Sequence, residues 1–408
     1  MRMCRGKRAF FNKINLMLFH KNILLLKLFT QNYIIFHMCL FKYKKMFFLV
    51  FIIFISACVE RNKNDILIPP AAPVALQKDN ITLTFAGDLM AHKSNTKIKD
   101  LSLIYKDVKE IFEEADLSFV NLETPIYEEK GYKGYPRFSI KKEYADAAQQ
   151  AGLNVFSLAN NHTNDQGEKG VEETYKYFAE RKKDNIFSAG IRAKKEDGLS
   201  YSLIETGGWK ILFAAVTEFS NTVDESKRVD IISSTPKGRR KFKETIIKLR
   251  EDNPCDVFVL SMHTYEPEYD LEVKESRKTY FKELNKAGID IVWGAHPHVF
   301  QGWDQTADKM AIYSLGNLIS AQRFKLNYDN PGENKQYTGD SALLQIKLKK
   351  SKDGGVKIVN IFPYLITTHI DEDRNFVIRR LTSEFADEQN KKTMKYYLKR
   401  IELMNKRI

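Results

Sequence analysis

Short apolar runs and amphipathic segments alternate along the middle of the chain. Runs that are almost continuously apolar and are closed by Gly, Asp, Asn or His predict buried strands, and they lie at 81–88, 116–123, 154–162, 211–218, 255–263, 289–298 and 310–317. Segments with apolar residues at helical spacing lie between them, at 102–115, 143–152, 170–183, 238–252 and 275–287. Strands that alternate with helices in this way predict an α/β fold.

The pattern changes beyond residue 340. Residues 341–350 and 356–366 alternate apolar and polar positions with a period of two, and Asp353-Gly354-Gly355 lies between them. This combination predicts a β-hairpin. A long charged helix is expected over about 374–406, packed on the domain. We therefore expect one α/β domain with an antiparallel addition and a terminal helix.

The first 57 residues follow another pattern. A basic stretch at 41–45 precedes the apolar run MFFLVFIIFISAC at 46–58, which is typical of a secretory signal. The apolar run is shorter than the roughly 20 residues that span a bilayer. Ile55-Ser56-Ala57-Cys58 resembles the lipobox of bacterial lipoproteins, in which the cysteine is acylated. We expect export and a lipid anchor on Cys58 in the membrane of a bacterial cell envelope; the alternative is a short anchor helix that is retained.

These features divide the chain into successive parts. Residues 1–37 precede a complete signal and are interpreted as a mis-assigned start or an extended leader, and 38–57 as the lipoprotein signal peptide. The polar, then proline-rich segment 58–80 predicts a tether. The α/β domain follows over 81–325, strands over 326–370 complete it, and the helix occupies 371–408.

Charge and cysteine content exclude two classes of protein. The net charge of +13 comes mostly from residues 1–57, which hold ten Lys/Arg and no acid, so the remainder has 55 basic against 52 acidic residues. Such a near-neutral balance argues against a nucleic-acid-binding protein. Only Cys58 and Cys255 remain after the signal. A disulfide scaffold is therefore not expected.

The predicted strands end in residues that bind metals or transfer protons. These residues are Asp88, Glu123, Asn161, His162, His263, His296 and His298. The carboxyl ends of strands in an open α/β sheet meet at one edge, so we expect the side chains to converge. Pro297 separates the last two histidines, and it predicts an extended segment with both side chains on one side.

A convergent set of this composition suits divalent metal chemistry. Two cations about 4 Å apart are held by a bridging carboxylate, neutral imidazoles and an amide oxygen. Mixed nitrogen and oxygen ligands favour Zn, Mn or Fe. Water held by such metals attacks a phosphorus centre while a nearby histidine protonates the leaving group. The sequence therefore predicts a site for one or two divalent ions.

Each residue also has an explanation without a metal. Asp88 fits a helix cap, and Asn161-His162 with Asp165 fits a turn before a helix. His263 fits the polar end of a buried strand. Glu218 and Glu266 either support the ligands or are solvated. The basic helix at 238–252 fits a solvated face better than a contact with anionic lipid or polymer, because acids are interleaved with the bases.

Six motifs in this order resemble the CapA family of capsule and poly-γ-glutamate synthesis proteins. They are FAGDLM, FVNLETP, SLANNHTNDQGEKGVEET, MHTYEPEY, GAHPHVFQGWD and YSLGN, and they span roughly residues 81–325. That family resembles the metallophosphoesterases. The resemblance implies a four-layer α-β-β-α sandwich, in which two β-sheets are flanked by helices.

The resemblance also implies roles. Asp88 matches the first aspartate, Glu123 the bridging carboxylate and Asn161 the amide ligand, and the remaining metal ligands are His263, His296 and His298. His162 matches the acid or transition-state donor, and Asp165 belongs with it to the catalytic set. The candidates for supporting contacts are His92, Glu218, Glu266 and Asn317. Met90 stands where the phosphoesterase pattern has a histidine ligand, and Ala295 replaces a glycine. His92 is the nearest substitute for the missing ligand.

The implied function is that of a membrane-anchored lipoprotein in the synthesis or export of a capsule-like anionic polymer such as poly-γ-glutamate. Membrane proteins of polymer synthesis and export are the expected partners, with an anionic polymer or phosphoester as substrate and no nucleic acid. Two other functions stay open. One is an exported phosphoesterase acting on a cell-envelope phosphoester, and the other is a non-catalytic polymer-binding component.

Overall fold

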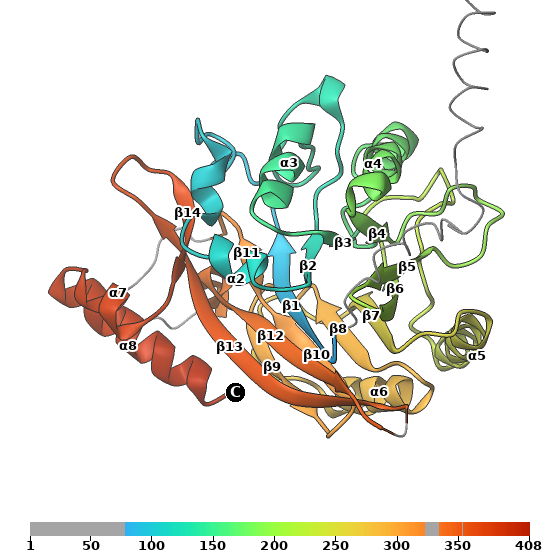
Figure 1. The fold of residues 1–408 in the computed structure, drawn as a ribbon. Helices are drawn as coiled ribbons and strands as arrows, with labels where there is room; N and C mark the ends of the chain where they lie inside the picture. The colour runs from blue at the N-terminus through green and yellow to red at the C-terminus, as the bar shows by residue number, and fades with distance from the viewer. Residues whose placement is uncertain (1–77, 323–333, 353) are drawn as a thin grey trace, which may run out of the picture. The chain divides into compact units, whose positions relative to one another are not determined.

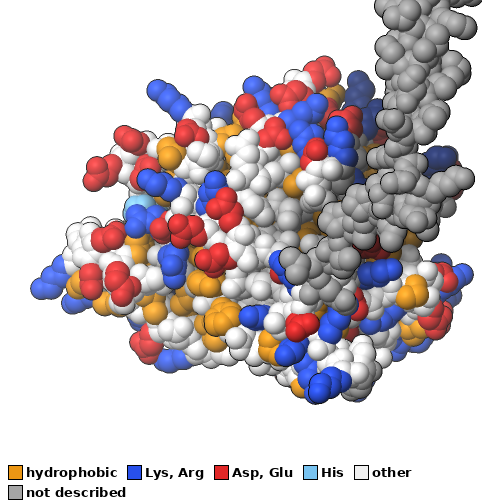
Figure 2. Space-filling view, viewed as in Figure 1, with side chains coloured by type: hydrophobic (Ala, Val, Ile, Leu, Met, Phe, Trp, Pro, Cys, Tyr) orange, Lys and Arg blue, Asp and Glu red, His pale blue; other side chains and the backbone are white. Residues whose placement is uncertain are grey.

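The computed structural model describes residues 78–322, 334–352 and 354–408. The predicted signal, Cys58 and nearly all of the predicted tether lie outside these residues. No helix in the described ranges is both long enough and apolar enough to cross a membrane. The face drawn in Figure 2 carries acidic and basic side chains interspersed, in keeping with the near-balance of charge beyond residue 57.

The first β-sheet has eight strands (Figure 1). They are β1 (Asn80–Leu89), β2 (Leu117–Leu122), β3 (Val155–Ser157), β4 (Phe187–Ala189), β11 (Asn317–Ile319), β12 (Asp340–Lys350), β13 (Val356–Ile370) and β14 (Phe376–Arg380). The order is β14-β13-β12-β1-β2-β3-β4, and β11 pairs with β1. Strands β1 to β4 are parallel, whereas β12, β13 and β14 are antiparallel. The predicted C-terminal hairpin is thus confirmed as β12 and β13.

The second sheet has six strands in the order β5-β6-β7-β8-β10-β9. They are β5 (Tyr201–Thr206), β6 (Trp209–Thr217), β7 (Val257–His263), β8 (Ile291–Ala295), β9 (Phe300–Gln305) and β10 (Met310–Leu315). The four central strands are parallel, and β5 and β9 are antiparallel edges. The parallel centre explains why these segments are apolar at almost every position, since both faces are covered.

Helices cover the outer faces of both sheets. The longer helices are α3 (Lys142–Gln150), α4 (Gly167–Arg181), α5 (Pro236–Asp252), α6 (Glu275–Lys286) and α8 (Lys391–Asn405); the shorter elements are η1 (Leu101–Tyr105), α2 (Lys109–Glu113), η2 (Glu128–Lys130), η3 (Lys182–Asp184), η4 (Asn334–Gly339) and α7 (Ser383–Asp387). Figure 1 shows α3 and α4 beside the first sheet and α5 and α6 beside the second.

Aromatic contacts define the layers. Phe119 of β2 packs edge-on against Phe213 of β6, with ring centroids 5.5 Å apart, so the two sheets face each other there. Phe119 pairs with Val155, and the next residue, Phe156, points to the opposite face. Phe156 packs on Phe178 of α4 at 4.8 Å. The predicted four-layer sandwich is confirmed.

Alternation along β7 shows how the second sheet is buried on both sides. Val257 and Val259 belong to the apolar core between the sheets. Phe258 and Leu260 belong to a second core, which also contains Phe242 of α5 together with residues of α6. Successive residues of β7 therefore pack into two different apolar cores. A strand that is apolar at every position predicts this burial on both faces.

Two predicted helices were wrong in extent. The segment 102–115 contains η1 and the short α2 in place of one helix, and between them the Asp107 carboxylate accepts hydrogen bonds from the backbone of Arg380 and the side chain of Arg379. That contact joins the segment to β14.

The segment 374–406 begins with β14, which pairs with β13, and the terminal helix proper is α8. Thr382 and Asn390 cap α7 and α8 with their side-chain oxygens. The exposed edge of β13 offers hydrogen bonds to β14, and helical periodicity in a charged segment does not reveal such an edge.

Candidate metal centre

The predicted ligands lie at the carboxyl ends of strands from both sheets. Asp88 is in the last part of β1, Glu123 follows β2, Asn161 and His162 follow β3, His263 ends β7, and His296 and His298 follow β8. All seven are at most 4% exposed. Gly87 makes the approach of β11 to Asp88 possible, because a Cβ there would lie 1.8 Å from the carbonyl oxygen of Gly316.

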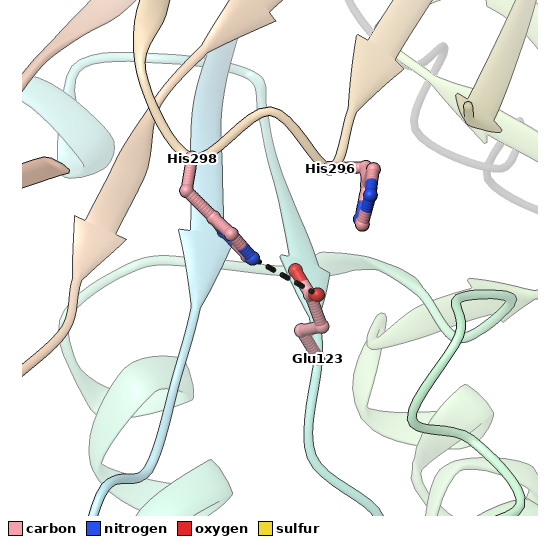
Figure 3. A group of neighbouring side chains, drawn as sticks. All are labelled: Glu123, His296 and His298. Carbon is pink, nitrogen blue, oxygen red and sulfur yellow. Dashed lines mark ion pairs between the residues drawn. The ribbon is translucent and has the colours of Figure 1, made fainter. Parts of the chain in front are cut away.

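Two overlapping groups have the composition of a metal site. One consists of Glu123, His296 and His298, and the other of Asp88, Glu123 and His263; within each group the ligand atoms lie within 4.8 Å of one another. Figure 3 shows Glu123 between the two histidines of the first group. Glu123 is the residue that both groups share, so a carboxylate that bridged two ions would be Glu123.

One oxygen of the buried Glu123 carboxylate lacks a hydrogen bond. Its Oε1 atom lies 3.6 Å from Nε2 of His263 and 3.6 Å from Nε2 of His298. That oxygen has no hydrogen-bond partner among the described residues. A buried, unpaired carboxylate oxygen is unfavourable unless a cation compensates it. The donor set therefore fits a divalent metal.

Two of the candidate histidine ligands have lowered pKa values. Burial and the neighbouring His296 hold the pKa of His263 well below its usual range. Burial, assisted by His298, lowers the pKa of His296 to about 3. Both rings are therefore neutral at pH 7, which is the form that binds metals. Burial and the repulsion of Asp88 raise the pKa of Glu123, so bringing a cation to this carboxylate also promotes its ionisation.

The tautomer of His298 follows from Asn317. The Asn317 amide nitrogen donates to the carbonyl oxygen of Thr338 at 2.9 Å, so its Oδ1 faces Nδ1 of His298 at 3.0 Å. Nδ1 is also 3.1 Å from Oδ2 of Asp88. Both neighbours are acceptors, so Nδ1 carries the proton and the lone pair of Nε2 faces Glu123. Burial acts against protonation of His298, but the hydrogen bond that His298 donates to Asp88 and the negative charge of Asp88 outweigh it and raise the pKa of His298.

Asn161, His162 and Asp165 lie against the same group. Oδ1 of Asn161 is 2.9 Å from Nε2 of His263. His162 contacts Oδ2 of Asp165 through Nδ1 at 2.7 Å, and the same oxygen accepts the backbone N–H of Phe138 at 2.7 Å. A carboxylate fixed in this way orients the imidazole, whose Nε2 lies 3.4 Å from Nδ2 of Asn221.

The backbone of the last motif differs from the prediction. Strand β8 ends at Ala295, and His296 and His298 have φ values of 102° and 59°. The expected extended segment was therefore wrong. The two side chains reach Glu123 through left-handed backbone conformations, which are uncommon for residues other than glycine and gather at functional sites.

Two asparagines that sequence reasoning missed connect the acidic ligands. Nδ2 of Asn121 donates to Asp88 at 2.8 Å and lies 3.3 Å from Oε2 of Glu123. Asn160 donates to Oδ1 of Asn121 at 3.3 Å and to the backbone oxygen of Leu122 at 2.8 Å. Both asparagines stand inside the motifs FVNLETP and SLANNH, which was the available signal. Buried amides between buried carboxylates are hydrogen-bonded by necessity.

Other candidates lie outside the two groups. Met90 is buried, and its backbone oxygen accepts hydrogen bonds from Asn95 and Tyr144. His92 belongs to neither metal group; its ring packs edge-on against Phe138 at 5.1 Å.

The acids Glu218 and Glu266 both form ion pairs with the buried Arg277. The backbone N–H of Glu218 also donates to the carbonyl oxygen of His263 at 2.9 Å. These two acids are thus neutralised by arginine, and their contact with the ligands is through the backbone.

His92 gives the metal-free protein a pH-dependent stability. Burial, with help from His298 and His162, lowers its pKa to about 3, whereas an unfolded histidine titrates near 6.5. Between these values the unfolded chain binds a proton that the folded chain does not, so the free energy of unfolding falls as the pH falls. The slope is about 1.4 kcal/mol per pH unit. Urea unfolding measures this effect. Between pH 7.5 and 5, the free energy of unfolding of His92→Gln should fall by about 2 kcal/mol less than that of the wild type. An equal fall in both proteins would contradict this account.

Comparisons with known proteins agree with the motifs. A family model described as "Bacterial capsule synthesis protein PGA_cap" matches residues 82–322. The capsule biosynthesis protein CapA of Bacillus anthracis is 27% identical over 76% of this chain and 74% of its own length. The PGA biosynthesis protein CapA of Bacillus subtilis (strain 168) is 26% identical over 69% of this chain and 72% of its own.

Among solved structures, the NAD nucleotidase of Haemophilus influenzae aligns with a TM-score of 0.43 and 11% identity over 80% of this chain and 68% of that chain. The family match covers more than half of the sequence and contains every predicted ligand. The chain belongs to the family described as bacterial capsule synthesis protein PGA_cap.

Proposed function

We propose that this chain acts in the synthesis or export of an anionic, capsule-like polymer such as poly-γ-glutamate, through a divalent metal site at the strand ends. We further propose that it is exported and anchored by a lipid on Cys58, beside membrane proteins of polymer synthesis or export. Family membership supports the polymer. The observation that carries the metal site is Glu123, a buried carboxylate shared by two ligand groups.

The residues have separate tasks in this proposal. Asp88, Glu123, His263, His296 and His298 would hold one or two ions of Mn, Zn or Fe, with the Asn161 oxygen as a further donor. When bound, such an ion supplies Lewis acidity to a phosphoryl or carbonyl oxygen. His162, oriented by Asp165, holds the proton that a leaving group needs.

A second candidate is an exported phosphoesterase that acts on a cell-envelope phosphoester. The specific observation in its favour is the His162–Asp165 pair beside the ligands, because a buried, oriented imidazole is the acid–base group that phosphoester hydrolysis uses. A polymer-binding component without catalysis has no need of such a pair.

Replacing a ligand tests the proposal in cells. In a strain that lacks the gene, His298→Ala should restore less than about a tenth of the polymer that wild type restores, because a lost metal ligand removes most of the activity. His369→Ala is the matched control, since this histidine lies in β13, outside both ligand groups, and it should restore polymer fully.

Three outcomes discriminate between the functions when protein abundance is equal. Polymer lost together with metal supports the first function. Normal polymer with a lost phosphoesterase activity supports the second. Normal polymer and unchanged phosphoesterase activity from a chain without metal contradict both enzymatic functions.

A further inference from the structure

The first half of α5 carries charge that helix electrostatics disfavours. Residues 236–243 contain five Lys/Arg and no acid, and the first acid is Glu244. The N-terminus of a helix has a partial positive charge, so cations there are unfavourable and anions are favourable. The acids that suggested a solvated face in the sequence all lie in the second half of the helix. The cations in the first half of α5 are thus unfavourable for the helix and have no acid beside them in this part of the helix. Such an arrangement points to an anion bound from outside the helix.

A cavity of about 420 Å³ lies between this end of α5 and helix α6. Its walls carry three cations, Arg239, Arg240 and Lys243, and the hydroxyl groups of Ser276, Thr279 and Tyr280. All of these groups donate hydrogen bonds. Both helices pack on the outer face of the second sheet (Figure 1). The cavity is therefore a concave surface rich in donors.

Two donors at the cavity lack partners. Tyr280 is only 4% exposed, and its buried hydroxyl has no hydrogen-bond partner among the described residues. Nε of Arg239 is also buried and unpartnered, and this guanidinium lies 4.4 Å from the centre of the Tyr280 ring. Burial and the Glu218 carboxylate raise the pKa of Tyr280, so its hydroxyl stays protonated. Buried donors without acceptors are rare in folded proteins, and a bound acceptor would satisfy them.

Two acids, Glu283 in the cavity wall and Glu218 beside Arg239, do not neutralise the cavity. Oε1 of Glu218 is 3.4 Å from Arg239, and Oε2 of Glu283 is 3.8 Å from Lys243, which is too long for a hydrogen bond. Arg240 has no ion pair among the described residues. Three cations thus face two carboxylates, and at least Arg240 and Lys243 are available to a ligand.

We propose that this cavity binds the carboxylates of an acidic polymer chain. The planar guanidinium groups match carboxylate geometry, and a concave pocket between helices suits a discrete oxyanion better than a flat membrane surface. Lys237 lies about one turn before Arg240 on α5, so an adjacent carboxylate of the same polymer chain would meet a further cation. The identity of the polymer rests on the proposed function, whereas the site itself rests on the geometry.

The cavity lies close enough to the candidate metal centre to deliver a polymer to it. Arg239 contacts Glu218, and the backbone N–H of Glu218 donates to the carbonyl oxygen of the ligand His263. In a parallel α/β sheet the N-termini of the helices lie at the same edge as the carboxyl ends of the strands. A chain bound at α5 would therefore be held beside the strand ends.

Fluorescence anisotropy with the full-length chain and a labelled decamer of γ-linked glutamate tests the proposal at 0.15 M salt. Arg240→Gln combined with Lys243→Gln should weaken binding about tenfold or more, because charge-assisted hydrogen bonds are lost. Tyr280→Phe should weaken it several-fold. Arg240→Gln alone should weaken binding several-fold. Lys241→Gln is its matched control, since it also removes one positive charge, from an exposed residue of the same helix that does not line the cavity, and it should change binding less than twofold.

Several results would overturn the proposal. Equal weakening by Lys241→Gln and by Arg240→Gln would mean diffuse attraction instead of a site. Binding of vesicles containing anionic phospholipid that the cavity variants abolish, with no binding of the decamer, would mean a membrane contact. The decamer should still bind to His298→Ala, so loss of the metal centre and loss of this site are distinguishable.

Discussion

Glu123→Gln should abolish metal binding and at the same time stabilise the metal-free protein. Glu123 is the residue common to both ligand groups, so its loss removes a ligand from each. The bound metal per chain should fall below about a tenth of the wild-type value. Without metal, the glutamine removes a buried carboxylate whose Oε1 is unpartnered and which Asp88 repels. The free energy of unfolding should rise by about 1–2 kcal/mol.

Elemental analysis and urea unfolding of chelator-treated protein measure the two effects. Glu266→Gln is the control for the change of chemistry, because Glu266 pairs with Arg277 and Lys274 and belongs to neither ligand group. It should leave metal content unchanged. A Glu123→Gln variant that keeps its metal would refute the bridging position. A metal-free variant that is less stable than wild type would show that Glu123 serves the fold.

His162→Gln should lower turnover about 100-fold or more while the metal stays bound. His162 lies outside both ligand groups, and its Nδ1 is held by Asp165 at 2.7 Å. The proposed proton transfer uses the opposite nitrogen, which glutamine does not replace. Asp165→Asn should lower kcat with little change in KM, since it disturbs the orientation of the imidazole and removes no substrate contact.

Hydrolysis of a chromogenic phosphodiester and metal content, measured on the same samples, provide the readouts. His369→Gln is the control, because it removes a histidine of β13 that belongs to neither ligand group. Loss of metal in His162→Gln would make His162 a ligand instead of a proton donor. Full turnover in this variant would exclude a role in proton transfer.

The sequence predicted the central strands well because their signal is local. Continuous apolar runs such as 255–263 reflect burial on both faces of a parallel sheet. It failed for strands at the edges of the sheets. β4, β5 and β9 were missed: the first is three residues long, and the other two are edges of a sheet with half-exposed patterns. β14 is a five-residue, half-exposed edge strand that pairs with the preceding β13, and the predicted charged helix over 374–406 included it.

The candidate ligands were identified because polar residues that close apolar strands stand out in any sequence. The contacts between these ligands could not be predicted from the sequence pattern. Asp88 and His298 are 210 positions apart in the chain, and their contact depends on the two sheets packing face to face. The supporting role of Asn121 likewise became visible only once Asp88 and Glu123 were adjacent.

The sequence by itself determined the alternation of strands and helices, the polar residues at the strand ends and membership of the family, because burial period and motif order are properties of the linear chain. Tertiary structure alone decided that Glu123 is shared by two ligand groups and that His296 and His298 reach it through left-handed backbone. It also decided that the cations of α5 surround a cavity against α6. These depend on packing between distant segments, whose free energy is set by contacts that no local window contains.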